Sequence, residues 1–377
     1  MNIVETTQSL VRIPSVNPAY DPASLAEIGM SDWLIAWAKE HGFEHEANEV
    51  MPGRSNVIIR LRNGPEHPHL LLNGHTDTVA IAKMTVPPFD AELRDGRIWG
   101  RGSADMKGQV ACMLHTLLRL REDTAAWKGT VTVGLVVDEE VGFTGIKHLL
   151  QNHSGFDFAI VGEPTRLEIV RGCKGCLRFA FRAHGKSAHS STPEKGASAI
   201  IAMAHALVAL ECFFAEDLSA SVHPALGRST GSVGIVQGGS GINIVPEFCE
   251  AKVDVRLVPG QSWEETYAAM KKVVTSIERP GIHWDFDEPP FWDLPFCWDE
   301  DHEFVRSACE TMGRTQSHVV NYACDASKIA AAGIPCIVFG PGDIAQAHTA
   351  NESIAVEELE QGVESYVRFA EALLKAD

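Results

Sequence analysis

Short apolar runs of strand length alternate with helix-like patterns along the first half of the chain. Between the runs, apolar residues recur at the spacing of one helix face, as in the segment that begins after Gly108. Strands that alternate with helices favour an α/β domain with a largely parallel sheet. The same alternation resumes over residues 301–377. The apolar runs of the first half are residues 56–61, 69–74, 131–137 and 158–165.

The middle of the chain has a different pattern. Residues 174–285 follow the order strand–helix–strand–strand–helix–strand, which is typical of a ferredoxin-like module. Within it, apolar and charged residues alternate over 251–257, the period of a half-buried antiparallel strand. We therefore expect one α/β domain, residues 1–173 and 286–377, into which a second domain, residues 174–285, is inserted.

Composition excludes several classes of protein. Hydrophobic residues make up 45% and charged residues 22%, which is ordinary for a globular protein. The net charge of −18 argues against nucleic acid or an anionic membrane as the main partner. The N-terminal segment lacks a basic start and an apolar core, and no uninterrupted apolar run approaches the length of a membrane span. Nine cysteines cannot all pair within one chain, so we expect a reducing cytoplasmic location.

Side chains that can bind a metal ion directly follow the apolar runs. Because ligands bind beyond the carboxyl ends of the strands in open α/β sheets, we expect these side chains to converge. Two imidazoles with three or more carboxylates suit zinc, cobalt or manganese. A carboxylate two residues after a ligand histidine can also accept the second N–H of its ring. The residues are His75 and Asp77 in 74–79, Asp105 in 99–108, Glu139 and Glu140 in 136–142, Glu163 in 161–165 and His348 in 340–352.

Each of these clusters has an ordinary interpretation by itself. An H-x-D triplet is usually a surface turn, and adjacent Glu139 and Glu140 can be a solvated helix start. The G-P-G-D sequence at 340–343 can be only a loop. Their common position after strand-like runs favours a shared site.

The ordered set of H-x-D, D after G-R-G, E-E, E-P and a late His resembles one family of metallopeptidases. This family contains acetylornithine deacetylases, succinyl-diaminopimelate desuccinylases, aminoacylases and bacterial glutamate carboxypeptidase. The resemblance extends from S-L-V-R-I-P-S-V-N-P at residues 9–18 to the segment 340–352. It implies a zinc-exopeptidase-like α/β catalytic domain with an inserted ferredoxin-like α+β domain that serves as lid and dimerisation domain. It also implies a non-proline cis peptide between Asp105 and Met106.

The resemblance implies two divalent metal ions per subunit, with Zn²⁺ first and Co²⁺ or Mn²⁺ as alternatives. The family's arrangement, carried onto this sequence, has Asp105 bridging both metals, His75 and Glu163 completing one, and Glu140 and His348 completing the other.

In the same arrangement Glu139 is the general base and Asp77 orients His75. Two metals about 3.5–4 Å apart lower the pKa of a bridging water and polarise an amide carbonyl. A carboxylate that is not bound to metal can take the proton of this water and return it to the leaving amine. The implied reaction class is metal-assisted amide hydrolysis.

The inserted domain resembles the family at three further residues. His189 would stabilise the oxyanion in the active site of a partner subunit. Asn243 would contact the substrate, and Arg256 would bind a substrate carboxylate. A histidine shared between subunits implies a homodimer formed through this domain. The ordinary alternatives are a surface histidine and a strand arginine paired with Asp254.

Glu163 is the fourth of the five implied metal ligands along the chain. A glutamate at this place favours a deacylase or a carboxypeptidase, because dipeptidases and tripeptidases of the family tend to have Asp there. Residues 322–354 look most like acetylornithine deacetylases, although Cys324 stands where a small or hydroxyl residue is expected. We therefore predict an amidohydrolase acting on an N-acyl amino acid or short peptide, most like an acetylornithine deacetylase. The alternatives are a desuccinylase, a glutamate-releasing carboxypeptidase and a non-catalytic binding protein. A cysteine hydrolase that uses Cys324 lacks a partner histidine in a recognisable motif.

Overall fold

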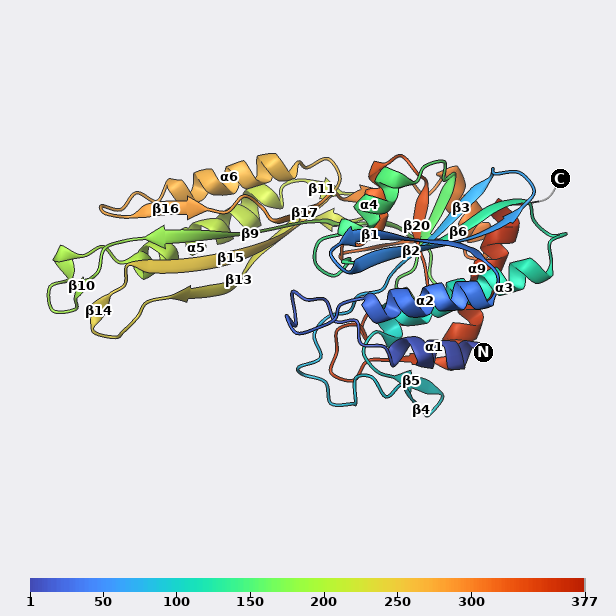
Figure 1. The fold of residues 1–377 in the computed structure, drawn as a ribbon. Coiled ribbons are helices and arrows are strands. Elements are labelled where there is room, and N and C mark those ends of the chain that lie inside the picture. Colours follow the sequence, from blue (N-terminus) through green and yellow to red (C-terminus); the bar gives the residue numbers. More distant parts are fainter. Residues whose placement is uncertain (376–377) are drawn as a thin grey trace. The chain divides into compact units, whose positions relative to one another are not determined.

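Four parallel strands form the centre of the first structural unit in this computed structural model, which describes residues 1–375. Every residue of β3 and β6 is buried, as expected for parallel strands covered on both faces. An antiparallel pair, β1 and β2, extends the sheet beside β6 (Figure 1). The order is β1 (Glu44–Met51), β2 (Arg54–Asn63), β6 (Gly129–Val136), β3 (His69–His75), β7 (Phe158–Val161) and β20 (Cys336–Val338).

Helices cover both faces of this sheet. On one face, Leu70 and Leu72 of β3 pack in a core shared with α3 and α9. On the other face, Leu71 and Leu149 lie beside Gly134, where α4 contacts α8. The alternation along β3 therefore places successive side chains in different layers. The helices are α1 (Ile3–Val11), α2 (Ile28–Glu40), α3 (Gly108–Glu122), α4 (Thr144–Asn152), α7 (Glu303–Thr311), α8 (Ala326–Ala331) and α9 (Val356–Leu373).

A small sheet and a turn lie beside the N-terminus of α3. The sheet consists of β4 (Glu92–Arg94), β5 (Arg97–Trp99) and β21 (Ser353–Ala355). The turn Ser103–Lys107 contains a cis peptide bond between Asp105 and Met106, so this prediction is confirmed.

The second unit contains an antiparallel sheet with a core of its own. Its elements follow one another as strand, helix, strand, strand, helix and strand, and the sheet order is β13-β15-β9-β16. This is the ferredoxin-like arrangement, and the predicted α/β fold class with such a module is confirmed. The elements are β9 (Gly175–His184), α5 (Ala199–Phe213), β13 (Thr230–Gly238), β15 (Phe248–Leu257), α6 (Trp263–Thr275) and β16 (His283–Phe286).

Shorter strands complete the second unit and the passages between the units. In the second unit they are β10 (Ala188–His189), β14 (Ile244–Val245), β11 (Val222–His223), β12 (Gly227–Arg228) and β17 (Phe291–Asp293). Where the chain passes between the units they are β8 (Val170–Cys173), β18 (Phe296–Cys297) and β19 (His318–Val320).

The first unit comprises Met1–Arg171, Trp298–His318 and the chain from Cys324 onward, and the second comprises Gly172–Cys297 and Val319–Ala323. The role of the inserted segment as lid and dimerisation domain, and the boundaries expected from the sequence, stay predictions.

One helical segment corrects an expectation from the sequence. Residues Ala199–Leu218 are long and apolar enough to cross a membrane, with a mean hydropathy of 1.7. Isolated polar residues such as His205 interrupt the apolar run in the sequence. The mean hydropathy of the segment nevertheless stays high enough for a membrane span. The core helix of a soluble protein has the same composition, and here Ala202, Met203 and Ala206 are buried in the core of the second unit. Only 28% of the segment's most apolar window is buried, which leaves an apolar face exposed.

A buried ion pair connects α2 to the sheet of the first unit. Glu27, just before α2, is fully buried and accepts two hydrogen bonds from Arg54 of β2, at 2.6 and 2.5 Å. Arg54 also lies 3.3 Å from a carboxylate oxygen of Asp138, which follows β6. Burial raises the pKa of Glu27, and the hydrogen bonds from Arg54 oppose this rise. Arg54 therefore compensates two carboxylates at this end of the sheet.

Replacing Arg54 by Met should lower the free energy of unfolding by about 3–5 kcal/mol, because Glu27 would remain buried without its cation. The double variant Glu27→Leu/Arg54→Met should recover most of this loss. Urea unfolding monitored by circular dichroism measures the free energy of unfolding of both variants. The control is Arg94→Met, which removes an exposed pair with Glu92 and should cost less than about 1 kcal/mol. An Arg54→Met variant as stable as the parent would contradict the interpretation.

Candidate metal centre

Three neighbouring strands bring the predicted site residues to one edge of the sheet. His75 is the last residue of β3, Glu139 and Glu140 follow β6, and Glu163 follows β7. These strands are parallel neighbours, so their carboxyl ends meet. The turn before α3 adds Asp105 to this edge, and the loop after β20 adds His348.

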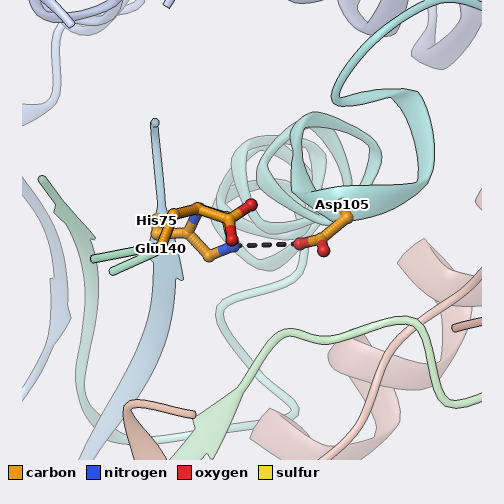
Figure 2. A group of neighbouring side chains, drawn as sticks. All are labelled: His75, Asp105 and Glu140. Carbon is orange, nitrogen blue, oxygen red and sulfur yellow. Dashed lines mark hydrogen bonds and ion pairs between the residues drawn. The ribbon is translucent and has the colours of Figure 1, made fainter. Parts of the chain in front are cut away.

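The most compact part of the site consists of His75, Asp105 and Glu140. One potential ligand atom from each lies within 4.8 Å of the other two. The Nε2 of His75 is 3.0 Å from Oδ1 of Asp105, the contact drawn as a dashed line in Figure 2. All three side chains are largely buried. This is the chemistry and spacing of a divalent cation site.

The two oxygens of Asp105 contact two different imidazoles. Oδ1 faces His75, whereas Oδ2 is 3.2 Å from Nε2 of His348. The same nitrogen of His348 is 3.2 Å from Oε2 of Glu140. Hydrogen bonds with Asp105 and Glu140 raise the pKa of His348 to about 10. The contacts of Asp105 and His348 thus connect four of the five predicted metal ligands.

Two glutamates complete the buried acidic group. Glu139 is 8% exposed, and its Oε2 lies 4.0 Å from Nε2 of His75. Glu163 is 4% exposed and lies close enough to Asp105 for the two charges to interact. Burial raises the pKa of both glutamates well above the usual range, and neighbouring carboxylates raise it further. Burial likewise raises the pKa of Glu140 to about 7.

This donor set fits a divalent metal. Protons on the imidazoles compete with a cation for the same nitrogen atoms, so metal binding would release them. A cation would also stabilise carboxylates that burial otherwise disfavours in their charged form.

Asp77 connects His75 to the loop that carries Glu139 and Glu140. Its Oδ1 is 3.5 Å from Nδ1 of His75, which contacts the backbone oxygen of Asp77 at 3.0 Å. The two carboxylate oxygens accept hydrogen bonds from the backbone N–H groups of Glu139 and Glu140, at 3.1 and 3.2 Å. Asp77 therefore holds the loop that carries both glutamates as well as facing His75.

Sequence reasoning missed Asn17, which is 1% exposed. Its side-chain amide donates to Oδ2 of Asp77 at 2.8 Å and to Oδ1 of Asp138 at 2.9 Å. Asn17 lies in the N-terminal segment that carries the family resemblance, but no local pattern connects it to residues about 60 and 120 positions later.

Sequence reasoning also missed Glu352, which is fully buried. Its Oε1 accepts hydrogen bonds from the backbone N–H groups of Ala104 and Asp105, at 2.9 and 3.0 Å. Its Oε2 accepts from Arg101 at 2.5 Å. Glu352 therefore fixes the turn from which Asp105 projects, and the only signal in the sequence was its place at the end of the segment 340–352.

A third missed residue is Asp325, which follows the unusual Cys324. It is 1% exposed, and its Oδ2 accepts a hydrogen bond from Asn73 at 2.8 Å. Burial raises the pKa of Asp325 to about 6, and its charge in turn contributes to the raised pKa values of Glu139 and Glu163.

The predicted residues of the second unit do not all come together. His189 in β10 pairs with Ile244 in β14, and Asn243 accepts a backbone hydrogen bond from Ser190, so His189 and Asn243 are neighbours. Both are exposed. Arg256 lies near the opposite end of β15.

The guanidinium of Arg256 contacts the carboxylate of Asp254 at 2.7 and 3.2 Å. This is the pairing named above as the ordinary alternative for Arg256. Arg178 donates to the same carboxylate at 2.8 Å.

Replacing Glu352 by Gln should weaken Zn²⁺ binding by about 10- to 100-fold, because the turn that carries Asp105 loses its charged anchor. Calorimetric titration of metal-depleted protein with Zn²⁺ measures this, with circular dichroism to check folding. Glu357→Gln, an exposed position in α9, should bind as the parent does. A folded Glu352→Gln variant with unchanged affinity would show that Asp105 needs no such anchor.

Comparison with known proteins identifies the family of this chain. The model of peptidase family M20/M25/M40 matches residues 71–372. An acetylornithine deacetylase of Myxococcus xanthus is 34% identical over 350 residues, 88% of each chain.

Solved structures have the same fold. A tripeptidase of Staphylococcus aureus superposes with a TM-score of 0.81 and 22% identity, covering 99% of this chain and 98% of its own. A dinuclear metal-binding peptidase of family M20 from Bacillus subtilis has a TM-score of 0.71 and 18% identity, covering 99% of this chain and 97% of its own. On the family match and the relative that spans most of both chains, the protein belongs to peptidase family M20/M25/M40 and is a hydrolase.

Proposed function

We propose that this protein is a metal-dependent amidohydrolase that removes the acyl group from an N-acyl amino acid, with N-acetylornithine as the first candidate substrate. The observation that supports this most is the carboxylate of Asp105, whose two oxygens each meet a different imidazole beside a buried glutamate. Relatives named acetylornithine deacetylase that span most of this chain support the substrate. The acidic composition also favours a small substrate over nucleic acid, and a cytoplasmic location is part of the proposal.

The proposed centre holds two divalent cations, with Zn²⁺ as the first candidate and Co²⁺ or Mn²⁺ as alternatives. Asp105 would bridge them, His75 and Glu163 would complete one set of ligands, and Glu140 and His348 would complete the other. The two contacts of Asp105 support this division. The name of the Bacillus subtilis neighbour, a dinuclear metal-binding peptidase, supports the number of two ions. When bound, the metal ions would polarise the amide carbonyl and lower the pKa of a water molecule.

Glu139 is the proposed general base. It is buried and lies 4.0 Å from His75, and the hydrogen bond that its backbone N–H donates to the carboxylate of Asp77 fixes its loop. A carboxyl whose pKa is raised by burial can hold a proton near neutral pH and pass it to the leaving amine. Asp77 would keep the ring of His75 in the orientation that presents Nε2 to the metal.

Replacing Glu139 by Gln should lower kcat/KM for N-acetylornithine by about 10³-fold, since the water then lacks its proton acceptor. The metal content should stay that of the parent. Glu140→Gln is the matched neighbour and should lose metal as well as activity. Steady-state kinetics on the Zn²⁺- or Co²⁺-loaded enzyme and elemental analysis measure these effects. Full activity of Glu139→Gln would reject this residue as the base, and metal-loaded protein that hydrolyses no N-acyl amino acid would reject the proposed function.

A second candidate substrate carries a succinyl group, as in N-succinyl-diaminopimelate. Exposed Lys83, which lines a cavity beside His348, favours it because an ammonium can pair with the carboxylate of a succinyl group. Turnover of the succinyl compound without turnover of N-acetylornithine would assign the enzyme to the second candidate.

The proposed assembly is a homodimer formed through the second unit. Strand β13 pairs with β15 on one side, and within residues 1–375 no strand pairs with its other edge. Ile235 and Val236 of this edge are 46% and 47% exposed. On α5, Ile201 and Val208 are 47% and 61% exposed. Open strand edges and exposed apolar faces of this kind are typical of subunit contacts.

The double variant Val208→Glu/Val236→Lys should convert a dimer to a monomer, because it places charges on both proposed contact surfaces. Light scattering coupled to gel filtration measures the mass. Leu93→Glu, at an exposed site in the first unit, is the control and should remain dimeric.

His189→Ala should lower kcat and leave the mass of the dimer unchanged, as expected for a residue that acts in the partner's site. A monomeric parent protein, or a double variant that stays dimeric, would contradict the proposed assembly.

A further inference from the structure

A cavity of about 440 Å³ lies between two loops of the first unit. One wall is the turn that follows Glu163, and it contributes Arg166 and Glu168. The other wall is the loop that follows α7, residues 313–318. None of the predicted site residues lines this cavity, and its volume is that of a small-molecule site.

Hydrogen bonds hold the two walls of this cavity together. The backbone N–H of His318 donates to the backbone oxygen of Ile169 at 2.7 Å. Nη2 of Arg314 donates to the backbone oxygen of Leu167 at 3.2 Å. Arg166 and Leu167 have positive φ angles of 57° and 60°, a conformation that is unfavourable for residues other than glycine. Such a conformation persists where surrounding contacts fix the backbone, so the cavity has a defined shape.

Two arginines determine the charge of this cavity. The guanidinium of Arg166 contacts the carboxylate of Asp343, which does not line the cavity. The guanidinium of Arg314 is 3.4 Å from Oε1 of Glu168, and Nε2 of His318 is 3.6 Å from Oε2 of the same side chain. Both distances are longer than a normal hydrogen bond. Glu168 is the one acidic residue that lines the cavity, and it compensates the cations of the loop after α7 only in part.

The donors of this cavity suit a molecule with two carboxylates. Arginine binds a carboxylate through a planar fork of N–H groups. A carboxylate of the chain already lies at each arginine, Asp343 at Arg166 and Glu168 at Arg314, which shows that each place accepts such a group. A dicarboxylate can replace both of them at once.

The wall that carries Arg166 is also joined to the loop that carries His348. The backbone N–H groups of Arg166 and Leu167 donate to backbone oxygens in the segment 340–343, at 2.7 and 3.0 Å. The contact between the side chains of Arg166 and Asp343 adds a further link to this segment. A ligand that draws Arg166 away from Asp343 would loosen the start of the loop.

We propose that this cavity is a second ligand site, which binds a small dicarboxylate between Arg166 and Arg314 and thereby lowers turnover at the metal centre. The inference goes beyond the proposed function, because binding in this cavity does not depend on which substrate the metal centre cleaves.

Calorimetric titration of the metal-loaded protein with malonate, succinate and glutarate tests the site. Acetate and inorganic phosphate serve as comparison anions. The best dicarboxylate should bind about 5-fold more tightly than acetate, which is the scale of one further ion pair. Phosphate that binds as tightly as the best dicarboxylate would overturn the assignment to two carboxylates.

Two variants should change the affinity for the dicarboxylate in opposite directions. Arg314→Met should weaken binding about 5-fold, because one guanidinium is lost. Glu168→Gln should strengthen binding by about the same factor, because the carboxylate of the chain no longer competes. Arg368→Met, an exposed position in α9, is the matched control and should bind as the parent does. Equal affinity of the parent, Arg314→Met and Glu168→Gln would place the anion elsewhere, such as at the metal ions, and would overturn the inference.

Steady-state kinetics with N-acetylornithine test the effect on turnover. The dicarboxylate should lower kcat of the parent and leave KM unchanged, because it does not occupy the substrate site. Arg166→Met should have a lowered kcat without added anion, because its contact with Asp343 is missing. A bound dicarboxylate that leaves kcat unchanged, or that competes with the substrate, would overturn the effect on turnover. An enzyme that hydrolyses no N-acyl amino acid would count against the proposed function, whereas the calorimetric test would still decide on the site.

Discussion

Repulsion among buried carboxylates is the constraint on which the rest of this structure depends. Asp77, Asp105, Glu139 and Glu163 are each less than 10% exposed and lie at one edge of one sheet. Buried charge is costly unless hydrogen bonds, counter-charges or a metal compensate it. Backbone N–H groups compensate Asp77, and two imidazoles compensate Asp105. The two glutamates have less compensation, and burial therefore raises their pKa values.

The same constraint explains why distant parts of the chain meet around the site. Arg54 compensates Glu27 and Asp138 at the base of the acidic loop. Arg101 and Glu352 form a second buried pair beneath the turn of Asp105. The second pair connects the segment of Asp105 to that of His348, and Arg54 connects Glu27 to the segment that carries Glu139 and Glu140. The compensation of charge and the rigidity of the site are thus achieved by the same contacts, because a hydrogen-bonded ion pair fixes both of its partners.

The two units contribute different chemistry to the proposed reaction. The first contains the candidate metal centre, so cleavage is proposed for one rigid sheet edge and its loops. The second presents exposed His189 and Asn243 together, and Arg256 engaged with Asp254. A substrate carboxylate that bound Arg256 would have to compete with Asp254 for the guanidinium. Recognition of this carboxylate would then depend on how the bound substrate positions it against Arg256.

Local pattern in the sequence determined the strands, the order of the ferredoxin-like module and the places of the candidate ligands His75, Glu140 and Glu163, because an apolar run that forms a strand ends at or shortly before each of them. Only the tertiary structure decided the roles of Asn17 and Glu352 and the place of Lys83 at the cavity beside His348. Their partners lie far away in the chain, and no periodicity records which distant carboxylate a side chain will meet. Which charges compensate one another is decided only when strands and loops come together at the carboxyl end of the sheet. The apolar runs that form those strands are, by contrast, visible in short segments of the sequence.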